Sequence, residues 1–496
     1  MADALNFPKL SRYKNPDAFR GRLAELRLDL PLDDRVLTAG DDSPLAKPIE
    51  IFGRKVGNRW CIHPMEGWDG TREGMPSPLT LRRWRKFGLS GAKLIFGGEA
   101  TAVQPGGRAN PRQLMALEST RAGLAQLLST LKEAHRETCG AVDDLLVGLQ
   151  LTHSGRFCKP NDWGRPEPRI LFHHPILDRR VGVAADDDSA ILSDAEIDAL
   201  IEAYIRAARI AAETGFDFVD VKHCHGYLGH EFLGAHTRPG KYGGSLENRT
   251  RFLRTIVERV RDEIPGLGIA VRISAFDLVP FHDDAATRVG RRKGTGIPEP
   301  FEHCLPYRYG FGVDPEDPTR YDLTETWQLM RILQDLDIQL VNITGGSPYY
   351  NPHIQRPAIF PPSDGYWPPE DPLVGVHRHI EVTRVLKQRF PRMIFVGTGY
   401  TYLQEFLPHV AQAVIRQGWT DLVGVGRMVL SYPSLPIDSL TSGLLDTKHI
   451  CRTFSDCTTA PRNALVSGCY PLDEFYRGRD EARRLKEIKG VAGETG

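Results

Sequence analysis

Eight short apolar runs recur along the chain, and each has the length and composition of a buried β-strand. Segments with helical periodicity separate most of these runs. Alternation of strands and helices is typical of βαβ units with a parallel sheet, and eight such units predict a closed (β/α)8 barrel of the α/β class, a TIM barrel. The runs are residues 60–65, 92–98, 145–153, 216–223, 268–274, 338–344, 393–399 and 421–427.

Two of the intervening segments show the helical pattern most clearly. Ser193 and Glu196 have the spacing of a capping box, which predicts that a helix begins there. The apolar residues that follow repeat at helical intervals, at Ile197, Leu200, Ile201, Tyr204 and Ala208. A second helix is expected within residues 245–264, with one apolar face formed by Phe252, Ile256, Val257 and Val260.

Polar residues interrupt three of the predicted strands near their carboxyl ends. Because side chains of a strand alternate between its two faces, the apolar neighbours are expected to face the helices: Leu149, Leu151, Val219, Val221, Val271 and Ile273. The polar residues then point into the barrel, and they are Gln150, Asp220, Lys222 and Arg272. Active sites of such barrels lie at this end, although a purely structural polar network would give the same pattern.

Insertions and extensions divide the chain around the barrel. We expect an N-terminal extension (1–46), a barrel (47–440) and a C-terminal extension (441–496). Long segments at 279–325 and 345–375, rich in Pro, Gly and aromatic residues, follow the fifth and sixth strands. Loops of this length in a compact domain are commonly functional, so both are expected to be lids over the active-site face.

The last two strands end in glycine-rich turns, "VGTGY" (396–400) and "VGRMVLSYPSLP" (425–436). Loops after the seventh and eighth strands of such barrels commonly bind phosphate. Gly397, Gly399 and Gly426 would allow close approach of the backbone, and Arg427 would add a positive charge. The pattern predicts a phosphate site without identifying the ligand.

Composition and charge narrow the class of protein. The 63 basic residues equal the 63 acidic ones, which excludes a general basic surface for nucleic acid or an anionic membrane. The first residues lack an apolar signal sequence, and eight cysteines are too few for a disulfide framework. We expect a cytoplasmic protein, with homo-oligomerisation left open.

Residues 47–440 resemble the old yellow enzyme family of FMN-dependent NADH:flavin oxidoreductases. The resemblance rests on "KPIEIFGRKVGNRWCIHPM", "GAKLIFGGEATAVQPGGR", "GLQLTHSGRF", "HGYLGHEFL" and "KYGGSLENRTRF". It implies FMN as cofactor, NADH or NADPH as electron donor, and reduction of an activated C=C bond in a small-molecule substrate. The cofactor-binding residues that it implies are Pro64, Met65, Glu66, Ala100, Gln150, Arg272, Gly397, Gly399, Gly426 and Arg427.

The same resemblance implies catalytic roles within "VKHCHGYLGHEF". Tyr227 matches the proton donor of the family, and His225 matches one of two residues that hold the substrate's carbonyl oxygen. Lys222 stands where the family has a histidine, and Glu66 stands where it often has Thr or Cys. A lysine favours an anionic group or pairs with Asp220 or Glu66, so the substrate is expected to be anionic or polar.

A metal site is the competing interpretation of this stretch. His223, Cys224 and His225 are close in sequence, but a hydrolytic metal site needs at least three converging ligands. The first strand offers only His63. We therefore expect no catalytic metal, and His223 and Cys224 are expected to be packing residues.

A cysteine motif follows the barrel at Cys451, Cys457 and Cys469. It resembles the four-cysteine iron–sulfur motif of the trimethylamine dehydrogenase and 2,4-dienoyl-CoA reductase branch, with Phe454 in the second position. Phenylalanine cannot bind iron, so an iron–sulfur cluster is not expected. The remnant leaves two alternatives open: an FMN-dependent amine or C–H dehydrogenase or demethylase, and a flavin-binding pseudoenzyme.

Overall fold

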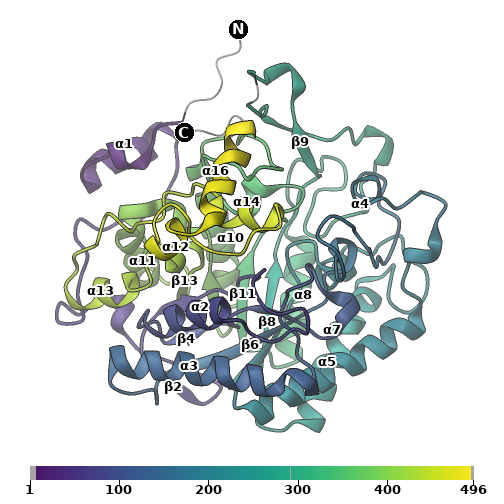
Figure 1. The fold of residues 1–496 in the computed structure, drawn as a ribbon, viewed down its shortest axis with the longest axis horizontal. Coiled ribbons are helices and arrows are strands. Elements are labelled where there is room, and N and C mark those ends of the chain that lie inside the picture. Colours follow the sequence, from purple (N-terminus) through teal and green to yellow (C-terminus); the bar gives the residue numbers. More distant parts are fainter. Residues whose placement is uncertain (1–6, 291, 493–496) are drawn as a thin grey trace.

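A closed barrel of eight parallel strands forms the centre of the computed structural model, which describes residues 7–290 and 292–492 (Figure 1). The strand ring closes because β4 pairs with both β3 and β6. The strands are β3 (Trp60–Ile62), β4 (Leu94–Ile95), β6 (Leu146–Thr152), β7 (Phe218–Val221), β8 (Gly268–Ser274), β11 (Leu340–Thr344), β12 (Ile394–Gly397) and β13 (Leu422–Val425). Each lies within one of the eight predicted runs, so the predicted (β/α)8 barrel is confirmed.

Helices surround the barrel and cover the outer faces of its strands (Figure 1). They are α2 (Pro78–Gly88), α3 (Arg121–Cys139), α5 (Asp194–Thr214), α7 (Leu246–Glu263), α8 (Thr324–Asp335), α10 (Pro372–Arg389), α11 (Leu407–Arg416), α12 (Arg427–Ser431) and α13 (Leu435–Thr441). The capping box of α5 is present: the Ser193 hydroxyl accepts from the Glu196 N–H at 3.2 Å, and the Glu196 carboxylate accepts from the Ser193 N–H at 2.8 Å.

Two apolar layers leave only one end of the barrel available for polar chemistry. The outer layer lies between strands and helices and includes Leu149, Leu151, Val271 and Ile273. An inner cluster includes Cys61, Leu94, Leu146, Phe218, Ala270, Leu340, Val396 and Leu422. The hairpin of β1 (Ile49–Ile51) and β2 (Arg54–Val56) packs on this inner cluster through Ile51 and Val56. Polar side chains of the interior are therefore confined to the carboxyl ends of the strands.

The segments that follow β8 and β11 pack against each other. The first contains the hairpin of β9 (Phe281–Asp283) and β10 (Gly296–Pro298), and the second contains α9 (Pro352–Gln355). The Phe281 N–H donates to the Tyr350 carbonyl at 2.8 Å, and Thr295 forms a β-bridge with Trp367.

The terminal segments add short elements to the barrel. In the N-terminal segment, α1 (Pro16–Glu25) places Phe19 in a stacked contact with Phe406, with ring centroids 4.2 Å apart. The C-terminal helices are α14 (Asp456–Arg462), α15 (Glu474–Arg477) and α16 (Asp480–Ala492), and Lys489 of α16 pairs with Asp456 at 2.6 Å. The remaining strand is β5 (Ala100–Ala102) beside β6, and the remaining α-helices are α4 (Asp178–Val181) and α6 (Leu228–Leu233). Within residues 7–290 and 292–492, no helix is both long and apolar enough to span a membrane.

Candidate active site

A large cavity lies at the carboxyl ends of the barrel strands, with an empty volume of about 1380 Å³ including its open mouth. Residues from the ends of β3, β6, β7, β8, β12 and β13 form its floor and walls. The segment after β11 contributes Pro348, Tyr349, Gln355, Arg356 and Pro357, and the C-terminal segment contributes Cys457, Thr458, Pro461, Arg462, Ser467 and Gly468. Segments far apart in the sequence thus close one cavity.

Most of the candidate residues named from the sequence line this cavity. They are Pro64, Met65, Glu66, Gln150, Lys222, His225, Tyr227, Arg272, Gly399, Gly426, Arg427 and Cys457. Four others lie outside the lining: Ala100, Gly397, Cys451 and Cys469. Ala100 is buried behind Met65, whose carbonyl accepts its N–H at 3.1 Å.

Asp220 holds the side chain of Gln150 and the backbone of Arg272, two residues that the family resemblance implies for cofactor binding. Its carboxylate accepts from Gln150 Nε2 at 2.5 Å and from the Arg272 N–H at 2.8 Å. Burial raises the pKa of Asp220 to about 7, against the opposing effect of the Gln150 hydrogen bond. Arg272 donates from Nη1 to the Pro64 carbonyl at 3.2 Å, while its buried Nε has no partner within the described chain.

The opposite wall of the cavity has unused hydrogen-bond donors suited to an anion. Arg427 donates to the Pro357 carbonyl at 3.2 Å, but its buried Nη1 has no partner in the part of the chain described. Arg356 has the same feature at Nε and Nη2. Burial and the neighbouring charge of Arg427 lower the pKa of Arg356 to about 9. Two adjacent guanidinium groups with free donors fit a phosphate such as that of FMN.

The backbone at this wall also leaves room for a ligand. A Cβ atom built on Gly426 would come no closer than 3.8 Å to any side chain. Gly399 has φ +92°, a left-handed conformation that favours glycine. Arg356 was missed in the sequence because it lies in an aperiodic insert, where no pattern gives the direction of its side chain.

His225 is held at the cavity in a strained backbone conformation. Its φ is +68°, which is uncommon for a residue with a side chain. The hydroxyl of Ser274 accepts from the His225 N–H at 3.0 Å, and the hydroxyl of Ser347 donates to its carbonyl at 2.8 Å. Burial first, and then the charges of Arg272 and Lys222, lower the pKa of His225 well below its ordinary value, so its imidazole is neutral.

Lys222 lies over the ring of Tyr227, with Nζ 3.8 Å from the ring centroid. The sequence offered Asp220 or Glu66 as ion-pair partners for this lysine. Neither carboxylate lies within 4.0 Å of Lys222 Nζ, and the structure pairs no other described carboxylate with it. Burial lowers the pKa of Lys222. Its ammonium group therefore lines the cavity without an ion-pair partner inside residues 7–290 and 292–492.

Glu66 instead contacts Tyr227, a contact that the sequence did not indicate. The Tyr227 hydroxyl donates to Glu66 Oε2, and the Tyr349 hydroxyl lies 2.7 Å from the Tyr227 hydroxyl. Glu66 Oε1 accepts from Trp68 Nε1 at 2.6 Å. Burial raises the pKa of Glu66, whereas the charge of Lys222 lowers it by a smaller amount.

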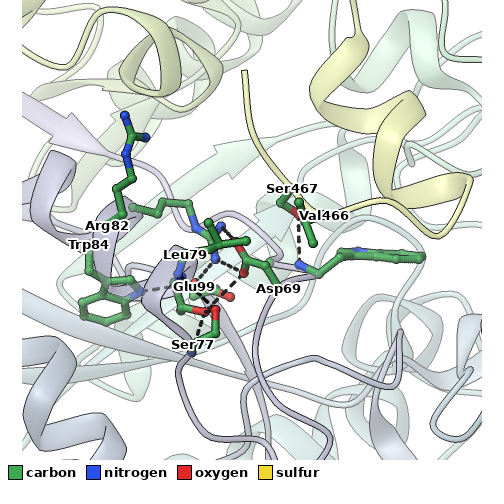
Figure 2. A network of polar contacts seen from close by, with 12 residues as sticks. Asp69, Ser77, Leu79, Arg82, Trp84, Glu99, Val466 and Ser467 are labelled. Carbon is green, nitrogen blue, oxygen red and sulfur yellow. Dashed lines mark hydrogen bonds and ion pairs between the residues drawn. The ribbon is translucent and has the colours of Figure 1, made fainter. Parts of the chain in front are cut away.

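A buried ionic network supports the segment that carries Glu66 (Figure 2). Arg83 donates to Asp69 at 2.5 and 2.8 Å and to Glu99 at 2.8 Å. On the other side, the Trp68 N–H donates to the Ser467 hydroxyl at 3.0 Å. The C-terminal segment thus helps to position the segment after β3.

The three cysteines of the C-terminal motif line a smaller neighbouring cavity, together with Phe454. Cys457 also reaches the main cavity, and Arg427 borders both. In the described part of the chain, no cluster of three or more His, Cys, Asp or Glu side chains is arranged to hold a metal ion. His223 is buried, and its Nδ1 lies 3.0 Å from the Val221 carbonyl.

Comparison with known proteins identifies the family. The profile of the NADH:flavin oxidoreductase / NADH oxidase family matches residues 44–291. An NADPH dehydrogenase of Bacillus subtilis (strain 168) is 30% identical over 256 residues, which are 50% of this chain and 69% of that enzyme.

Two solved structures share the fold at lower identity. A 2-naphthoyl-CoA reductase superposes with a TM-score of 0.62 at 19% identity, covering 88% of this chain and 58% of the reductase chain. An old yellow enzyme homologue from Zymomonas mobilis superposes with a TM-score of 0.51 at 22% identity, covering 79% of this chain and 91% of the homologue. The family expected from the sequence is confirmed, and this chain belongs to the NADH:flavin oxidoreductase / NADH oxidase family, the old yellow enzyme family of FMN-dependent oxidoreductases.

Proposed function

We propose that the protein uses NADH or NADPH to reduce an activated C=C bond in a small anionic or polar substrate. The observation that carries this proposal is the shared cavity at the carboxyl ends of the strands. One wall provides free arginine donors from Arg356 and Arg427, and another provides Lys222, His225 and Tyr227.

The residues at the cavity fit FMN, which supplies hydride chemistry when bound. Arg427 would hold its phosphate, and Arg272 and Gln150 would hydrogen-bond the pyrimidine side of its ring. The backbone of Pro64 and Met65 would support the ring. The orphaned Nε of Arg272 and Nη1 of Arg427 support this assignment, since buried donors normally have partners.

The chain's own residues provide the proton and hold the substrate. The Tyr227 hydroxyl gives a proton to the substrate carbon next to the activating carbonyl. His225 is neutral, so it can donate a hydrogen bond to the substrate's carbonyl oxygen without adding a charge. Lys222 contributes the nearby positive charge.

The unpaired Lys222 ammonium supports an anionic substrate. A buried charge is costly unless it is paired, and this lysine has no carboxylate partner in the described chain. A carboxylate on the substrate would provide that partner. A hydrogen bond to a charged group contributes about 1.5–3 kcal/mol, which corresponds to about a 10- to 100-fold preference over a neutral analogue.

The test separates the two half-reactions. NADH or NADPH is mixed anaerobically with the purified protein, and bleaching of the flavin absorbance is followed. An unsaturated ketone that carries a carboxylate is then compared with its methyl ester as the acceptor. The flavin absorbance should bleach with the nicotinamide and then recover faster with the carboxylate-bearing ketone than with its methyl ester. Lys222→His should remove this difference between the two acceptors. Absence of bleaching with either nicotinamide would refute the proposal.

Oxidation of an amine or an activated C–H bond is the second candidate function. The observation that favours it is the Glu66 carboxylate, which accepts from the Tyr227 hydroxyl and would assist this phenol as a base. Bleaching of the flavin by an amine in the absence of nicotinamide would support this alternative.

A further inference from the structure

Tyr227 needs a route by which its proton is replaced. The residue lines the cavity but is only 2% exposed, so bulk water has restricted access to it. Its hydroxyl has two polar partners in the described structure, Glu66 and Tyr349. Tyr349 stacks on Phe157 at 4.1 Å between ring centroids, and burial raises its pKa well above the ordinary value. The phenol of Tyr349 is thus a poor proton source.

Glu66 is the partner that connects Tyr227 to the solvent of the cavity. It lines the cavity and is only partly buried. Glu66 Oε2 accepts a hydrogen bond from the Tyr227 hydroxyl. Glu66 Oε1 accepts from Trp68 Nε1 at 2.6 Å and from Asn110 Nδ2 at 3.5 Å. Trp68 is itself held by Ser467. These contacts fix the carboxyl against the phenol.

We propose that Glu66 is the proton-relay partner of Tyr227, an inference that rests on the proposed function. When Glu66 is protonated, its carboxyl O–H donates to the Tyr227 oxygen, the reverse of the direction in the structure, and the phenol O–H is then free to face the substrate. As the O–H bond of Tyr227 breaks and the substrate C–H bond forms, the O–H bond of Glu66 breaks and its proton restores the phenol. Glu66 then takes a proton from cavity water. The substrate gains one proton, water supplies it, and both side chains return to their initial state.

The electrostatics around Glu66 suit this role. The charged and titratable groups that face it are Lys222, Arg462, Tyr227 and Tyr349. No ion pair with a cation holds its carboxylate in the described chain. Burial raises its pKa, so the carboxyl keeps its proton to a higher pH than an exposed glutamate does. Glu66 should therefore be protonated at low pH and lose this proton as pH rises through its pKa. The rate of the proton-transfer step should fall over the same pH range.

The experiment measures each half-reaction across pH for the wild type and for Glu66→Gln. The recovery of flavin absorbance with the unsaturated acceptor should slow by about 10- to 100-fold in the variant, less than the about 10²–10⁴-fold contribution of a direct general acid. The fall in rate with rising pH should also disappear. Glu66→Asp keeps a carboxyl and should retain the pH-dependent fall. Glu258→Gln, an exposed matched control, should leave the profile unchanged.

Two readouts keep this inference distinct from the proposed function. If the wild type is bleached by nicotinamide and recovers with the acceptor, but Glu66→Gln keeps the wild-type rate and pH profile, the relay is refuted while the function stands. If the wild type is never bleached, the proposed function itself fails. Where Glu66→Gln does not fold, Glu66→Asp decides: loss of the pH-dependent fall in this variant overturns the relay.

Discussion

Replacement of Arg83 by methionine should destabilise the protein strongly and disturb the active-site cavity. Arg83 is 5% exposed and donates to Asp69 and Glu99, whose side chains are 0% and 1% exposed. A Cβ atom on Gly67 would overlap both Arg83 and Glu99, so this network packs directly under the residue that follows Glu66.

The expected loss of stability follows from leaving the two buried carboxylates, Asp69 and Glu99, without their cation. Removal of one partner of a buried ion pair costs about 3–5 kcal/mol. Arg85 on the same helix provides a matched control, because it pairs with Glu137 at the surface with side chains 46% and 53% exposed. An exposed pair contributes about 0–1 kcal/mol, so Arg85→Met should have little effect.

The assay is urea-induced unfolding of the wild type and both variants at the same FMN and protein concentrations, since a bound ligand shifts apparent stability. Arg83→Met should lower the unfolding midpoint far more than Arg85→Met, and it should weaken retention of FMN. Equal midpoints for the two variants would refute the view that the buried network holds this segment in place.

Three further changes test other parts of the account. Tyr227→Phe should slow recovery with the unsaturated acceptor by about 10²–10⁴-fold while bleaching by nicotinamide is retained, as stopped-flow absorbance would measure; an unchanged recovery rate would remove Tyr227 from the mechanism. Arg427→Leu should weaken binding of FMN by about 10- to 100-fold and leave riboflavin binding unchanged in a fluorescence titration, and equal losses for both flavins would contradict the phosphate assignment. Burial raises the pKa of Asp220 to about 7 from about 3.9 in the unfolded chain, so its contribution to stability is present below about pH 4 and is lost as pH rises to about 7. The free energy of unfolding of Asp220→Asn should lack that decline between about pH 4 and pH 7. If this free energy changes with pH by the same amount in the wild type and in the variant, the raised pKa of Asp220 is refuted.

The barrel was predictable from the sequence because its strands and helices are determined by residues close to one another along the chain. Each strand is a short apolar run, and each helix that follows has its own periodicity and cap, as α5 shows with Ser193 and Glu196. Strand alternation also gave the direction of Gln150 and Arg272, both of which line the cavity. Such features depend only on neighbours a few residues away.

The contacts that complete the site were not predictable in this way. Tyr227 and Glu66 are 161 residues apart in sequence, and only closure of the barrel brings their side chains together. Arg356 lies in an insert without periodicity, and Ser467 lies in the C-terminal segment. The sequence suggested that Lys222 could pair with Glu66, but the structure gives that carboxylate to Tyr227.

The most direct test of the account is the visible spectrum of the purified protein before and after denaturation. The account predicts a flavin spectrum in the native protein and the release of FMN, rather than riboflavin or FAD, into the supernatant. A colourless protein that does not take up added FMN would contradict the central claim that this cavity is a flavin site.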